Sequence, residues 1–115
     1  MSAIDDIQAI DDKLSDWIIH TSPSAGDATG LASMRQAISL HTQLDQQLTA
    51  LQLGDLQAES AALAAVLASQ GPVLTGLRTR ITAVQSGITA AESVISFAAQ
   101  AIAAAVKIMG VVAAL

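Results

Sequence analysis

The sequence predicts an all-α protein, and three observations favour helix over sheet. Of the 115 residues, 52% are hydrophobic but only 2% are aromatic and 13% are charged, so the apolar residues are mostly aliphatic. The chain contains 24 alanines, and alanine has the highest helix propensity of all residues while it is depleted in strands. Apolar residues also recur every three or four positions over long segments, as in amphipathic helices. At this length we expect one helical domain, residues 1–115.

A first, shorter helix is predicted over residues 3–20, where the apolar residues Ile7, Ile10, Leu14 and Trp17 are three or four positions apart. Trp17, the one tryptophan, is expected to anchor this helix to the rest of the protein, although a lone large aromatic also suits a binding interface. Proline, glycine and small hydroxyl residues fill residues 21–30, which are therefore an internal loop. Asp27 or Thr29 is expected to cap the helix that follows.

A second helix is predicted over about residues 29–70, with an interruption at Gly54. There the apolar period shifts by two positions, which indicates a kink, or a short break with Asp55 capping a new helix. The tripeptide Gln70-Gly71-Pro72 predicts a firmer boundary, because glycine suits the position after a helix and proline suits the first turn of the next.

The last predicted helix, about residues 72–112, carries an uninterrupted coiled-coil heptad pattern. Its apolar seam comprises Leu74, Leu77, Ile81, Val84, Ile88, Ala91, Ile95, Ala98, Ile102, Ala105, Met109 and Val112. Residues 29–70 and 72–112 are then two arms of an elongated antiparallel helical hairpin that turns at Gly71. The shorter N-terminal helix, packed on one end of this hairpin, completes a three-helix bundle.

Two rows of side chains are candidates for an interaction surface. One is a row of small hydroxyl residues beside the seam: Thr75, Thr79, Thr82, Ser86, Thr89, Ser93 and Ser96. The other is a row of leucines, Leu53, Leu56, Leu63 and Leu67. A solvated helix face usually carries charged residues, so the hydroxyl row suits packing against another copy or a helical partner. Two other interpretations stay open: an undercharged solvent face, and the lining of a membrane bundle.

The membrane interpretation also draws on residues 93–115, in which Lys107 is the one charged residue and which are long enough to cross a bilayer. Against it, the segment is rich in alanine and no basic cluster flanks it. The N-terminus is acidic, unlike a signal peptide. The expected location is therefore the cytoplasm, while export without a cleaved signal stays open.

No catalytic or metal-binding motif occurs in the sequence, so we expect a protein without enzymatic activity or cofactor. Asp12, Asp16 and His20 lie one helical turn apart and could in principle hold a metal, but an ordinary solvated acidic face explains them better. His41 is expected to be a partly buried, hydrogen-bonded histidine, and Arg78 and Arg80 are expected at the surface. A net charge of −5 argues against nucleic-acid binding.

The predicted hairpin resembles, in outline only, small secreted hairpin proteins of the WXG type. The turn here reads Gln70-Gly71-Pro72 in place of Trp-x-Gly, so the resemblance implies no function. The preferred hypothesis is a non-enzymatic helical interaction or assembly protein that forms a homo-oligomer or binds a helical partner. The alternatives are a membrane-active, pore-forming or membrane-inserting protein, and a soluble immunity or chaperone-like protein that binds through an acidic face.

Overall fold

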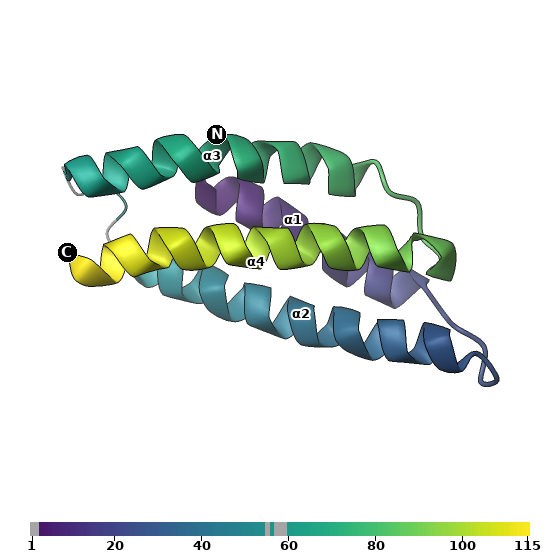
Figure 1. The fold of residues 1–115 in the computed structure, drawn as a ribbon. Coiled ribbons are helices and arrows are strands. Elements are labelled where there is room, and N and C mark those ends of the chain that lie inside the picture. Colours follow the sequence, from purple (N-terminus) through teal and green to yellow (C-terminus); the bar gives the residue numbers. More distant parts are fainter. Residues whose placement is uncertain (1–2, 55, 57–59) are drawn as a thin grey trace.

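The computed structural model describes residues 3–54, 56 and 60–115, and the regular structure in them is entirely helical (Figure 1). It consists of α1 (Ala3–His20), α2 (Ala28–Leu53), α3 (Ala61–Thr82), the 3-10 turn η1 (Ile88–Ala90) and α4 (Ala91–Ala114). The predicted all-α bundle is confirmed, and it is elongated, at 53 × 22 × 16 Å.

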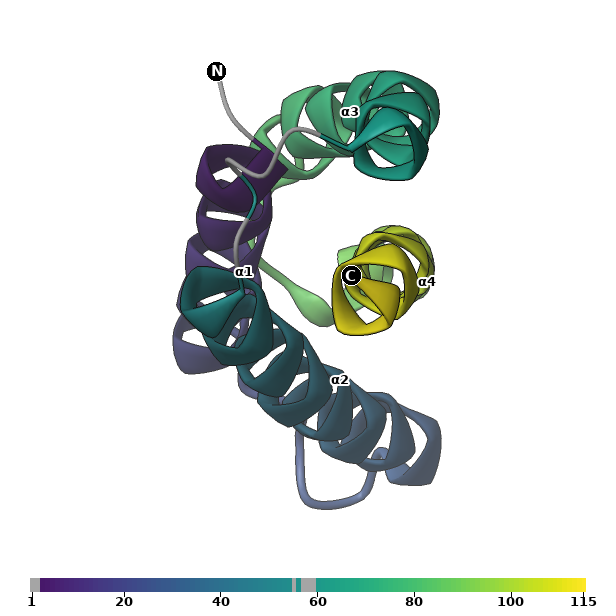
Figure 2. The ribbon, with the colours of Figure 1, turned by 90° about the vertical axis from the view of Figure 1, so that its left-hand side faces the viewer.

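The helices α1, α2 and α3 form an arc, and α4 lies on the concave side of that arc (Figure 2). Successive helices run in opposite directions, so that α1 and α3 point one way and α2 and α4 the other (Figure 1). Both α1 and α4 pack against α2 and against α3. One side of α4 is therefore enclosed by the other helices and its opposite side is open.

The buried side chains form two clusters along the bundle. The larger one joins all four helices and includes Ile7, Ile10, Leu48, Leu77 and Ile108. The smaller one surrounds Trp17 and includes Leu14, Ala37, Val94 and Ala98. Within α4 the fully enclosed positions are mostly alanines, which allow its neighbours to approach closely.

The first helix follows the prediction, with the bounds Ala3–His20. Trp17 is completely buried, so the expectation that it anchors α1 is confirmed and a role on an exposed interface is excluded in this fold. Asp27 caps α2, because its carboxylate accepts a hydrogen bond of 2.9 Å from the backbone N–H of Gly30.

The interruption at Gly54 is a complete break between two helices. Gly54 follows the last residue of α2, and its N–H donates to the carbonyls of Ala50 and Leu51. A Cβ at this position would lie 2.7 Å from Cγ1 of Val112 in α4, so only glycine fits without a shift. Ser60 caps α3; Asp55, expected as the cap, lies outside the described residues.

The predicted turn at Gly71 is wrong, because α3 runs through Gly71 and Pro72 without a break. Pro72 occupies an exposed position, where water can satisfy the carbonyl that a proline leaves without its helical N–H partner. Leu63, Leu74 and Leu77, on both sides of the proline, are buried. Burial of each such side chain stabilises the fold by about 1.5–3 kcal/mol, which together outweighs the cost of about 3 kcal/mol for proline.

The predicted continuous helix over residues 72–112 is also wrong, since the chain turns between α3 and α4. Gly87, with φ 131° and ψ 154°, adopts a conformation that is essentially restricted to glycine. The connection keeps Val84 and Ile88 partly buried against the core, so the apolar period continues across it. The predicted hairpin with a third helix at one end is accordingly replaced by a bundle of four α-helices in the described residues.

Candidate interaction surface

The side of α4 that faces away from the other helices is the candidate site. The residues along it are Glu92, Ser96, Ala99, Ala103, Val106, Lys107 and Gly110, and all are exposed; we call this surface the α4 outer face. Apart from the adjacent Val106 and Lys107, they recur three or four positions apart, on the side of the helix opposite the buried Val94, Ala101 and Ile108. The sequence places a charge at only two positions of α4, Glu92 and Lys107.

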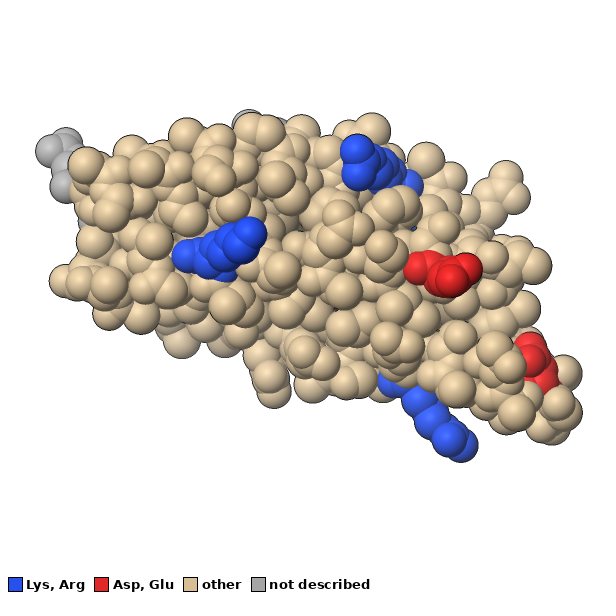
Figure 3. Space-filling model, viewed as in Figure 1, with Lys and Arg blue, Asp and Glu red and all other residues tan. Residues whose placement is uncertain are grey.

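This face is unusually poor in charge for the surface of a helical protein. Figure 3 shows it from the side of α4, with few charged side chains scattered over a broad uncharged area. The segment Ile88–Ala114 has a mean hydropathy of 1.8 over its most apolar 18-residue window, and 33% of that window is buried. By length and composition this helix could cross a membrane. The core helix of a soluble bundle can have the same length and composition. Within α4, Val106 is a large hydrophobic side chain that the other helices leave exposed, at 48%.

The predicted hydroxyl row is exposed throughout, but the turn at residues 83–87 divides it between elements. Thr75, Thr79 and Thr82 lie on α3 and donate to backbone carbonyls one turn earlier. Thr75 also donates to Asp6 of α1, which places the α3 part of the row on the side of α1. Ser93 and Ser96 are the members on α4, while Ser86 and Thr89 lie in the turn and in η1.

The predicted leucine row is not one surface. Leu63 is buried in the core, at 1% exposure, and Leu56 and Leu67 pack against that core. Leu53, at the end of α2, is 85% exposed. The break after α2 causes this separation, because the four leucines form one row only if a continuous helix joins Leu53 to Leu63. Leu53 alone of the four is fully available to a partner.

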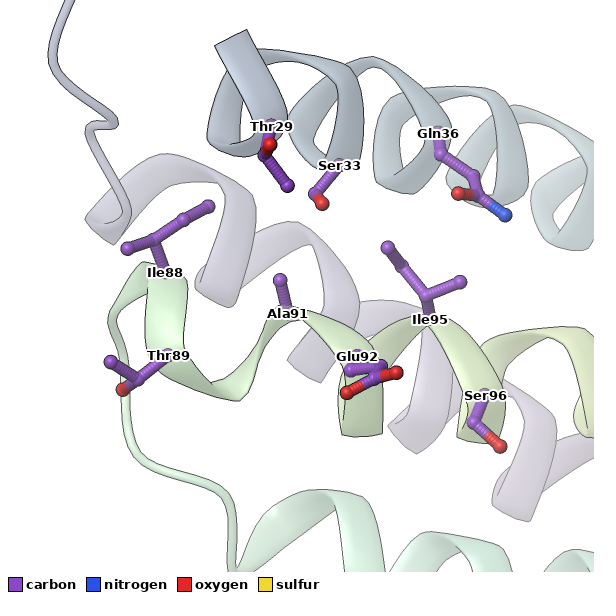
Figure 4. Close-up of a pocket in the computed structure, with 9 residues that line it drawn as sticks. All are labelled: Thr29, Ser33, Gln36, Ile88, Thr89, Ala91, Glu92, Ile95 and Ser96. Atoms are coloured by element: carbon purple, nitrogen blue, oxygen red, sulfur yellow. The ribbon is translucent and has the colours of Figure 1, made fainter. Parts of the chain in front are cut away.

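An open pocket of about 640 Å³ adjoins the α4 outer face where α2 and α4 begin (Figure 4). In this view Ile88, Ala91 and Ile95 point towards α2, which contributes Thr29, Ser33 and Gln36. The full lining is Thr29, Ser33, Gln36, Ile88, Thr89, Ala91, Glu92, Ile95 and Ser96. Glu92 is the one ionisable group among them.

A buried ion pair between α1 and α3 was not predicted from the sequence. Asp6 is 1% exposed, and its carboxylate accepts hydrogen bonds from Arg78 at 3.1 Å and from Thr75 at 2.9 Å. The expectation that Arg78 is merely a surface residue is therefore wrong. The sequence contains one indication of this ion pair, which is the position of the two residues. Asp6 directly precedes Ile7, and Arg78 directly follows Leu77, so both border an apolar stripe.

A second polar contact joins α1 to α2. Oδ1 of Asp11 lies 2.8 Å from Nδ1 of His41, so the two side chains are in direct polar contact and form an ion pair when His41 is protonated. Burial raises the pKa of Asp11, while His41 lowers it and Asp45 raises it. His41 is partly buried, as predicted, and its Nδ1 lies within hydrogen-bonding distance of Asp11.

The acidic row on α1 has ordinary local partners. Asp12 accepts a hydrogen bond from Gln8, and His20 pairs with Asp16 at 3.1 Å one turn away. Within residues 3–54, 56 and 60–115, no three His, Cys, Asp or Glu side chains converge on a position that could hold a metal ion. The acidic row on α1 is therefore an exposed charged surface without a group of converging metal ligands among the described residues.

No protein family, curated protein or solved structure matches the chain.

Proposed function

We propose that the protein is a non-enzymatic helical interaction protein that assembles through the α4 outer face, either with copies of itself or with a helical partner. The observation that carries the proposal is the uncharged character of the open side of α4: the exposed positions between Glu92 and Lys107 carry no charge, and Val106 among them is 48% exposed. A contiguous uncharged surface with an exposed apolar side chain is suited to an interaction site.

The distribution of charge supports the same surface. Asp5, Asp12 and Asp16 are exposed on α1, which lies behind α4 in the view of Figure 1. The α4 outer face carries two opposite charges, separated by uncharged residues. Interface cores are depleted in charged residues, so α4 is better suited than α1 to close contact.

Sedimentation velocity of the full chain, from low to several hundred micromolar, tests the proposal. We expect an oligomer, and we expect Ala103→Glu to shift it towards monomer, because a charge placed within the contact must be desolvated. Ala103 is exposed, so the substitution leaves the core intact.

Ala68→Glu is the matched control for this experiment. Ala68 is also exposed, and it lies one heptad before Thr75, on the side of α3 that faces α1. It should leave the mass unchanged. A wild-type chain that is monomeric at several hundred micromolar would contradict self-assembly, and equal effects of both substitutions would contradict the assignment to α4.

A membrane-active role is the second candidate, and the length and hydropathy of Ile88–Ala114 favour it. It requires α4 to leave the arc and insert into the bilayer. Flotation with anionic and neutral vesicles, together with dye release, separates it from assembly in water. The third candidate, binding of a cationic partner by the acidic residues of α1, predicts an affinity that falls steeply with salt.

A further inference from the structure

The two charges of the α4 outer face lie on either side of a midpoint between Ala99 and Gln100. Glu92 precedes Ala99 by seven residues, and Lys107 follows Gln100 by seven. Both side chains are exposed, and neither forms an ion pair within the described part of the chain. Lys107 lies fifteen positions after Glu92, which corresponds to about 22 Å along the helix axis.

This spacing is self-complementary for two antiparallel helices. When a second α4 is turned about a two-fold axis between Ala99 and Gln100, Glu92 of each copy lies opposite Lys107 of the other. A parallel arrangement in register would place like charges opposite each other. Isologous two-fold contacts of this kind are the commonest arrangement in homo-oligomers.

The residues between the two charges permit close contact. Ser96, Ala99 and Ala103 are small, so that two helices can approach closely there. Val106, which is 48% exposed, would be covered by the opposing helix.

We infer that the occupant of the α4 outer face is a second copy of this chain, docked antiparallel with its α4 on the two-fold axis. The inference rests on the proposed function and specifies its partner and geometry. Glu92 and Lys107 determine the orientation, and the small residues between them make the contact.

Charge exchange tests the pairing. Glu92→Lys and Lys107→Glu should each weaken dimerisation about tenfold or more at low salt, because each places like charges opposite each other twice. The double variant, Glu92→Lys with Lys107→Glu, should restore a dissociation constant close to that of the wild type. If the double variant is as weak as the single ones, the antiparallel pairing is wrong.

Spin-label distances test the orientation independently, since the chain contains no cysteine. In the proposed dimer, labels at Ser93→Cys lie about 20 Å apart along the axis, and labels at Ala114→Cys lie about 44 Å apart. A parallel dimer would give similar, short distances at both positions and would overturn the inference.

These experiments distinguish a wrong dimer geometry from a wrong proposed function. A dimer that Ala103→Glu dissociates, but whose two label distances are alike, would overturn the antiparallel geometry and leave assembly through α4 standing. A chain that stays monomeric at several hundred micromolar would overturn both the dimer and self-assembly. Flotation of the wild type with vesicles, without a dimer in water, would identify a lipid surface as the occupant and overturn the inference.

Discussion

Trp17 and Gly87, seventy residues apart in the sequence, are joined by a hydrogen bond of 3.1 Å from Nε1 of the indole to the backbone carbonyl. The N–H of Gly87 donates in turn to the hydroxyl of Thr21, 3.2 Å away. Both backbone polar groups of Gly87 are thus held, one by Trp17 in the last turn of α1 and the other by Thr21 directly after that helix. This contact fixes the place where the chain reverses between α3 and α4.

Gly87→Ala should lower the free energy of unfolding by about 1–3 kcal/mol, because alanine rarely adopts this backbone conformation. Urea unfolding at one protein concentration measures the effect. Gly76→Ala is the matched control: it lies within α3 and its added Cβ meets no atom within 4 Å. That control should stabilise the protein by about 0.5–1 kcal/mol, and a loss of stability in both variants would contradict the assignment of the turn.

Arg78→Met should lower the free energy of unfolding by about 1–3 kcal/mol, since it keeps much of the aliphatic stem but leaves the buried carboxylate of Asp6 without its cation. The cost should be smaller than for a fully buried pair, because the side chain of Arg78 is 31% exposed. Arg80→Met, at an exposed position of the same helix, is the control. Equal unfolding midpoints for the two variants would be inconsistent with the ion pair.

Asp11→Asn should become more stable relative to the wild type as the pH rises from 3 to 7. Burial raises the pKa of Asp11 above its ordinary value of 3.8, so the folded state binds this proton more tightly than the unfolded chain does. The wild type therefore loses stability as the pH rises from 3.8 through the raised pKa, and the asparagine variant lacks this loss. A difference in unfolding free energy that stays constant across this range would refute the expectation.

His41→Gln tests the contact between Asp11 and His41 from the other side chain. His41 lowers the pKa of Asp11, so its removal should raise that pKa further. NMR titration of the Asp11 carboxyl in the two proteins measures the change directly. An unchanged or lower pKa in the variant would show that the two side chains do not interact in solution.

Pro72→Ala should raise the free energy of unfolding by about 1–3 kcal/mol, because α3 is continuous there and alanine restores a helical N–H. Pro23→Ala is the matched control, since Pro23 lies in the connection between α1 and α2. Its removal should lower the free energy of unfolding by about 0.4–1 kcal/mol, because the unfolded chain without this proline has more conformational entropy to lose on folding. If Pro72→Ala also destabilises the protein, a turn at Gly71 is supported.

The helical class, the bounds of α1 and the burial of Trp17 could be predicted from local pattern alone. The heptad seam also identified buried or partly buried positions, from Leu74 to Val112. Its continuity was misleading, because the connection between Ile81 and Ala91 preserves the apolar period while the backbone turns. Periodicity reports which residues face a core; it does not report whether one helix or two carry them.

The error at Pro72 has a different origin. Local propensity favours a break there, but the apolar stripe from Leu63 to Ile81 is buried as one surface, and this tertiary contact outweighs the preference of one residue. The pairing of Asp6 with Arg78 depends on how α1 packs against α3, which no local pattern contains. The charges of the α4 outer face could be read from the sequence, but their exposure could not.

The order of the helices along the chain has a consequence for synthesis. Residues 91–114 leave the ribosome after the three helices that enclose them, so the inner surfaces of α1, α2 and α3 have no α4 to cover them until then. Their apolar side chains are exposed to other nascent chains during this interval. Binding by a chaperone should therefore be strongest for ribosome-bound chains that have exposed α3 but not yet α4.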